Sequence, residues 1–167
     1  PVELSESTNK DNVWTLRGVV DYDFPANTIV PAEGYLLVVN FDPNADSNRS
    51  ESFRTKYSIA SDIPLFGPYR GKLSNNSGTV RLQKPGEPDD QTEPRVLVDS
   101  VRYMDQSPWP VAADGMGHSL QRLDSAGFAN DPANWGSAAP AAGVANSAGA
   151  APIISSQPSF TNVSQGS

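Results

Sequence analysis

The chain contains no cysteine, so disulfide bonds do not hold its fold and it has no thiol for redox chemistry. It also lacks any run of about 18 apolar residues, and we therefore expect no segment that spans a membrane. No signal peptide is recognisable, and because the chain starts at Pro1 we expect its native start to lie upstream.

Positive charge is scarce, because 12 lysines and arginines stand against 19 acidic residues and leave a net charge of −7. Nucleic acid binds to basic surfaces, so this charge argues against a nucleic-acid partner. Arg54, Lys56, Arg70 and Lys72 could still gather into a basic patch, although dispersed surface charges are the simpler interpretation.

Loop-forming residues are plentiful, with 15 prolines and 13 glycines in 167 residues, whereas hydrophobic residues make up only 37%. This composition predicts one domain with a modest core and many turns. Short alternating runs recur between the turns. The predicted strands are Trp14–Arg17, Val20–Phe24, Thr28–Val30, Gly34–Asn40, Val80–Gln83, Val96–Tyr103 and Ser119–Leu123. Seven or eight such strands are typical of an all-β sandwich.

Other stretches depart from this alternation. Gly34–Asn40 is continuously apolar, which predicts a central strand covered on both faces. Ser50–Tyr57 is the one candidate for a helix, with Ser50 as its cap. Ile63–Tyr69 is predicted to be an apolar loop, and Pro85–Pro94 an exposed hairpin loop. The predicted core consists of Trp14, Leu16, Tyr35, Leu37, Val39, Val80, Leu82, Val101 and Leu120.

The composition changes near the end of the chain and suggests three parts. Residues 1–143 carry the sandwich pattern. Val144–Ala151 ends a stretch of Ala, Gly and Ser that begins at Ala138, and it is predicted to be a linker. Pro152–Ser167 is predicted to be a strand-like tail or the start of a further immunoglobulin-like repeat.

Longer motifs follow one another in a specific order between Val2 and Gly143. They are Trp14–Gly18, Val20–Pro25, Ile29–Val39, Leu73–Asn75, Val98–Tyr103, Pro108–Pro110, Ala113–Gly115, Ser119–Arg122 and Asn130–Trp135. In these motifs the chain resembles the lamin tail domain family in its bacterial form. The resemblance implies an immunoglobulin-like fold, so we expect an all-β, antiparallel β-sandwich with one short helix.

The resemblance also carries expectations about context. Bacterial members are accessory modules of large exported proteins, which implies an extracellular or cell-surface location, and the family offers no catalytic residues to carry over. Members usually begin with a further strand that is missing here, unless Val2–Leu4 is a diverged form of that strand. A missing strand would leave a sheet edge unpaired.

One polar stretch offers oxygen ligands for calcium, from Asp42, Asn44, Asp46 and Glu51. The EF-hand pattern requires Gly at its sixth position and Glu at its twelfth, where this chain has Ser47 and Phe53. We therefore interpret the stretch as a loop that leads into the helix. A looser calcium site is the alternative, and otherwise we expect no cofactor.

The positions of the histidine and the aspartates in the sequence do not favour a catalytic site. His118 is the only histidine, and Ser119 next to it would point to the opposite face of the same strand. Four aspartates could pair as the carboxylates of glycosidases do, namely Asp21, Asp23, Asp99 and Asp105. Asp21 and Asp23 occupy the solvated face of one strand, however, and Asp99 fits a polar position partnered by Arg102.

Three aromatic residues are candidates for a binding surface: Trp109, Tyr69 and Trp135. Trp109 lies between two prolines and either plugs the sandwich or presents a flat ring, and the plug is the simpler interpretation. Trp135 is expected to pin the final segment onto the body.

These observations favour a non-catalytic structural or protein-interaction module that acts by sandwich packing and edge-strand contacts. The alternatives are a carbohydrate-binding module with exposed aromatic rings and an accessory domain of a secreted hydrolase. Expected partners are other domains of the same polypeptide or other protein subunits. Self-assembly is a further hypothesis, in which Pro152–Val163 donates a strand to an unpaired edge.

Overall fold

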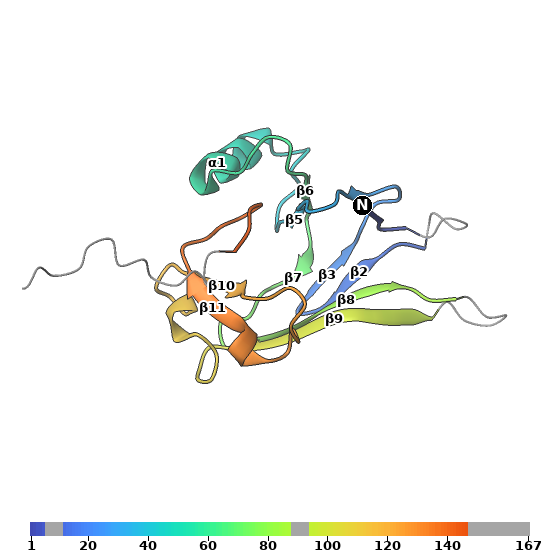
Figure 1. Cartoon of the computed structure of the whole chain (residues 1–167). Coiled ribbons are helices and arrows are strands. Elements are labelled where there is room, and N and C mark those ends of the chain that lie inside the picture. The colour runs from blue at the N-terminus through green and yellow to red at the C-terminus, as the bar shows by residue number, and fades with distance from the viewer. Residues whose placement is uncertain (6–11, 88–93, 147–167) are drawn as a thin grey trace, which may run out of the picture.

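A computed structural model describes residues 1–5, 12–87 and 94–146 of the chain. Of the residues, 35% lie in strands and 13% are helical, which confirms the predicted all-β class. These residues contain one α-helix, α1 (Ser47–Tyr57), and two 3₁₀ turns, η1 (Val111–Ala113) and η2 (Pro132–Asn134). Figure 1 shows α1 set apart from a body made of strands.

The body is built on a five-stranded antiparallel sheet in the order β7-β3-β2-β8-β9. Its strands are β2 (Thr15–Gly18), β3 (Val20–Asp23), β7 (Arg70–Gly71), β8 (Ser77–Pro85) and β9 (Arg95–Met104). β8 and β9 pair along their full lengths, with one irregularity between Leu82 and Gln83. The hairpin predicted around Pro85–Pro94 is therefore confirmed, although residues 88–93 lie outside the described chain.

The sheet has an apolar inner face and a polar outer face, because side chains alternate along each strand. The register places Leu16 beside Leu82 on the inner face. On the outer face Arg17 lies beside Arg81 and forms an ion pair with Asp23. The inner face therefore needs cover, whereas the outer face meets water at Arg81 but is covered at Thr15, which is 2% exposed.

Short elements supply that cover. β10 (Ser119–Arg122) and β11 (Trp135–Ala138) form an antiparallel hairpin, and Figure 1 shows it across one end of β8 and β9. β1 (Val2–Glu3) pairs with β4 (Ile29–Val30), and β5 (Leu37–Val38) pairs with β6 (Leu65–Phe66). The fold is thus a β-sandwich whose second layer consists of short pieces.

The strand predicted over Gly34–Asn40 is wrong in length and in pairing. Only Leu37 and Val38 pair, and they run parallel to β6, which the sequence placed in a loop. Pro64 and Pro68 flank β6, and because proline has no N–H, neither residue can donate a hydrogen bond to the ladder. Tyr35, assigned to the core, precedes the paired residues and is 40% exposed.

The predicted helix is present but begins three residues earlier than expected, at Ser47. Asp46 is its N-cap, and its Oδ1 accepts a hydrogen bond from the Arg49 N–H at 3.0 Å. Ser50, the predicted cap, lies within the helix and donates to the carbonyl of Pro43 instead. Phe53 packs against Tyr57 with ring centroids 5.0 Å apart, as its spacing predicts.

The most buried apolar side chains are Leu4, Val20, Phe24, Val39, Phe41, Ile59, Trp109 and Ala129. Val39 is the one predicted core residue among them. The half-buried predictions are Trp14, Leu16, Leu37, Val80, Leu82, Val101 and Leu120. They face inward or lie in the interior, but the short covering elements leave part of each accessible.

The segment after β11 packs against the body. Ala138, predicted to begin the stretch rich in small residues, is instead the last residue of β11 and pairs with Ser119. Gly143 has a φ of 77°, and a Cβ there would lie 3.2 Å from the side chain of Ile63. Residues 147–167, which include the predicted tail at 152–167, lie outside the described chain.

Phe24→Ala should strongly destabilise the fold. The Phe24 ring is 4% exposed and packs edge-on against Tyr22 and Phe66. Its truncation leaves a cavity and should lower the free energy of unfolding in urea by about 3–5 kcal/mol. Phe128→Ala removes the same atoms from a ring that is 73% exposed. It should change the free energy of unfolding by less than about 0.5 kcal/mol. Equal losses in the two variants would contradict this placement of the core.

Candidate functional site

An apolar pocket of about 540 Å³ lies between the five-stranded sheet and the β10–β11 hairpin, and we call it the interlayer pocket. Its size is within the range of small-molecule sites. Val80, Val101 and Tyr103 line it from β8 and β9, and Leu120 and Trp135 line it from the hairpin. Its rim includes Leu73, Ser74, Asn75, Asp105, Ala113 and Asp114. The pocket therefore depends on the packing of segments far apart in sequence.

Tyr103 is fixed in the wall of this pocket by its strand register. Gly78 is opposite Tyr103, and a Cβ at Gly78 would lie 2.9 Å from the Cε1 of the Tyr103 ring. The missing side chain lets the ring lie against β8. The Tyr103 hydroxyl donates to the carbonyl of Ser74 at 2.9 Å. Burial raises the pKa of Tyr103, and the nearby Tyr69 phenol raises it further.

The aromatic binding candidates do not form an exposed row. Trp109 is only 5% exposed, so it acts as a plug and cannot present a flat ring to a sugar. Its ring centroid lies 5.9 Å from that of Trp135, which is half-buried and donates from Nε1 to the carbonyl of Ala129. Tyr69 is also half-buried, beside Tyr103. Trp135 is the one candidate of the three that lines the interlayer pocket.

The rim of the pocket is polar and acidic. Asn75 donates from Nδ2 to the Oδ1 of Asp114 at 3.2 Å and so joins two loops across the mouth. Asp105 and Asp114 both line the pocket, and no lysine, arginine or histidine is among its lining residues. The sequence analysis weighed Asp105 only as a catalytic carboxylate, and no local signal connected Asn75 with Asp114, which lies 39 positions away.

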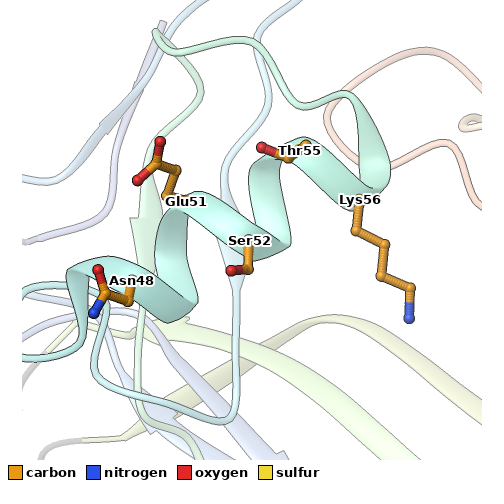
Figure 2. Close-up of a pocket in the computed structure, with 5 residues that line it drawn as sticks. All are labelled: Asn48, Glu51, Ser52, Thr55 and Lys56. Atoms are coloured by element: carbon orange, nitrogen blue, oxygen red, sulfur yellow. The ribbon is translucent and has the colours of Figure 1, made fainter.

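Two of the four calcium candidates have other side-chain roles in the structure. Asp42 accepts hydrogen bonds from the N–H groups of Asn44 and Ala45, and Asp46 caps α1. Glu51 points outward from α1 in Figure 2, beside Asn48, Ser52, Thr55 and Lys56, which together line a shallow polar hollow. Within residues 1–5, 12–87 and 94–146, no three His, Asp or Glu side chains gather as metal ligands would.

The four aspartates weighed as catalytic carboxylates lie in different surroundings. Asp21 and Asp23 belong to β3, where Asp23 pairs with Arg17, and Asp105 lines the interlayer pocket. Asp99 bonds through Oδ2 to Arg122 Nη1 at 2.6 Å, so its partner is Arg122 of β10 and not Arg102. His118 is exposed and precedes β10.

Three of the four basic residues weighed as a patch have separate side-chain contacts. Arg54 donates to the carbonyls of Ala60 and Ile63, just beyond its own helix. Lys56 lies over the ring of Tyr57, and Arg70 of β7 lies 3.9 Å from Asp23. Arg54 and Arg70 therefore serve different parts of the fold.

A second exposed apolar surface lies along β9, which is an edge strand of the sheet. Val96, Leu97 and Val98 are each more than two-fifths exposed. Leu97, Val98 and Phe128 line one open groove. We call these four residues the β9 edge.

No protein-family model, curated protein or solved structure matches this chain. Within the described residues, the structure has no helix of the length and apolar character needed to cross a membrane.

Tyr103→Phe should reduce the loss of stability at high pH. Because burial raises the pKa of Tyr103 above its ordinary value of about 10, the unfolded chain releases this proton first. Its contribution to stability is therefore present below about pH 10 and is lost as the pH rises toward the folded pKa. Urea unfolding at about pH 8 and about pH 11 should show a smaller difference for Tyr103→Phe than for the unsubstituted chain. A difference as large as in the unsubstituted chain would contradict a raised pKa for the half-buried Tyr103 phenol.

Proposed function

We propose that this chain is a non-catalytic protein-interaction module of a larger exported protein, located outside the cell or on its surface. The resemblance to bacterial lamin tail domains supports the context of an exported, multidomain protein. The mechanism is the packing of a partner segment along a sheet edge, without bond chemistry. The observation that carries the proposal is the apolar, accessible β9 edge.

The exposure pattern of β9 is unusual for a strand of a sandwich. Inner-face positions are normally covered and outer-face positions polar, yet Val96, Leu97 and Val98 are consecutive, apolar and accessible. Phe128 extends the same groove and is among the most exposed apolar side chains of the described chain. Adjacent exposed apolar side chains of this kind mark interaction sites.

The backbone of β9 is open at only one end. The N–H of Arg102 donates to Asn130 Oδ1 at 2.8 Å, and the N–H of Ser100 donates to Asp99 Oδ1 at 2.9 Å. These side chains occupy the edge from Ser100 onward and prevent pairing there. An extended segment can therefore add to the sheet alongside Arg95–Val98.

We propose that this segment is the C-terminal stretch Pro152–Val163, supplied by the same chain or by a neighbouring copy. The stretch has no charged residue and carries Ile153, Ile154 and Phe160, which suits an apolar edge. Its attachment point also favours β9, because Asn146 donates to the carbonyl of Arg122, whose guanidinium binds Asp99. The six residues from Asn146 to Pro152 can span about 20 Å when extended.

Deletion of residues 152–167 tests this proposal directly. We expect amide hydrogen exchange across Val96–Val98 to accelerate about tenfold or more in the truncated chain, because opening a protected strand edge exposes its N–H groups. Leu97→Lys should have the same effect in the full chain, since a charge on an edge strand opposes pairing. Light scattering then distinguishes the donor: a monomer uses its own tail, whereas a larger mass shows that the strand comes from a neighbour.

Ile29→Lys is the matched control, because Ile29 is 56% exposed on β4 and Leu97 is 54% exposed on β9. The control should leave both mass and β9 exchange unchanged. If the deletion alters neither the mass nor the exchange of Val96–Val98, the edge does not accept this tail and the proposal is wrong.

A further inference from the structure

We propose that the interlayer pocket binds an alkylammonium group, that is, a positively charged nitrogen on an apolar stem. This inference goes beyond the proposed function and does not depend on the β9 edge. It concerns the other end of β9, where Tyr103, Met104 and Asp105 reach the pocket.

The interior of the pocket suits the apolar stem. Val80, Val101 and Leu120 supply aliphatic surface from both layers, and Tyr103 and Trp135 supply aromatic surface. The polar atoms of these two aromatic side chains already have partners, at the carbonyls of Ser74 and Ala129. What remains accessible of them is ring surface, and the face of an aromatic ring attracts a cation.

The carboxylates that line the pocket favour a positively charged ligand. Asp105 and Asp114 are the two ionisable carboxyl groups that line the pocket, and no basic side chain lines it to offset them. The net charge of −7 acts in the same direction. An anion of the same shape would meet carboxylates and no counter-charge, so a fatty-acid type of ligand is disfavoured.

One exposed hydrogen bond joins two of the lining residues. It runs from Asn75 to Asp114 and is 3.2 Å long. An ammonium group carries three N–H donors and can take the place of Asn75 at the carboxylate of Asp114.

The surroundings of the mouth extend the apolar surface outward. Leu73 at the rim, Val111 of η1 and Met116, two residues beyond Asp114, are all more than half exposed. These exposed apolar side chains suit a ligand that extends beyond its ammonium group. Such an alkylammonium group is carried by a free amine or by a lysine side chain of a protein.

The test measures binding of three probes of equal length to the full chain, by the shifts of backbone amide signals in NMR spectra. The probes are hexylammonium, hexan-1-ol and hexanoate. We expect hexylammonium to bind with a dissociation constant about tenfold or more below those of the neutral and anionic probes, and to shift amides of β9, β10 and η1. Equal affinity for hexan-1-ol would overturn the proposal, because it would show an apolar cavity without charge selection.

Two variants locate the charge selection. Asp105→Asn combined with Asp114→Asn keeps the shape of both side chains and the acceptor oxygen for Asn75, and should weaken hexylammonium binding about tenfold while leaving hexan-1-ol unchanged. Asp62→Asn removes one exposed carboxylate that does not line the pocket and should have no effect. An undiminished affinity in the double variant, with its fold verified by urea unfolding, would overturn the proposal.

A fourth probe distinguishes the source of the ammonium group. The peptide acetyl-Gly-Lys-Gly-amide presents a lysine side chain with neutral ends. Tighter binding of this peptide than of hexylammonium supports a protein partner, and weaker binding supports a free amine. Failure of both to shift any pocket amide at millimolar concentration would overturn the proposal, even if the β9 edge binds its strand.

Discussion

The ion pair between Asp99 and Arg122 holds the two layers of this fold together. Arg122 reaches from β10 to Asp99 of β9 through Nη1, and its Nη2 donates to the carbonyl of Gly127. Its own carbonyl accepts a hydrogen bond from Asn146, and it is paired in register with Trp135 of β11. One side chain and its backbone thus connect the sheet, the covering hairpin, the loop before η2 and the final described segment. The Asp99 carboxylate is partly exposed, so the pair contributes mainly by fixing positions and less by its electrostatic energy.

Both proposed binding surfaces follow from a mismatch in length. The covering strands β10 and β11 have four residues each, whereas β8 and β9 have nine and ten. Figure 1 shows the uncovered ends of β8 and β9 projecting beyond the hairpin. Where the hairpin lies over the sheet, its few side chains leave the interlayer pocket incompletely filled. Where it stops, Val96–Val98 has no cover, and the β9 edge results.

Local spacing was sufficient to predict several elements, and it failed where a contact is distant in sequence. The alternating runs identified β3, β8, β9 and β10, because the alternation of apolar and polar residues depends only on the residues within each strand. The same rule misplaced Gly34–Asn40, because the paired length there depends on the short partner strand β6 and not on the residues of Gly34–Asn40 alone. Asp99 was recognised as a partnered position, but Arg122 lies 23 residues away and no local signal chooses it over Arg102. The interlayer pocket was missed for the same reason, since its wall joins residues as far apart as Leu73 and Trp135.

The two surfaces share one strand but should act independently. From Leu97 to Tyr103 the strand advances six residues, or about 20 Å. Asp99 lies between them and is held by Arg122, and β9 is paired with β8 along its whole length. Coupling between two sites requires an element with two arrangements that both ligands bias, and a strand fixed in this way offers only one. A partner strand at Val96–Val98 and an ammonium group beside Tyr103 should therefore bind with additive free energies. Under the two proposals, a ligand at one surface should leave the affinity of the other surface unchanged.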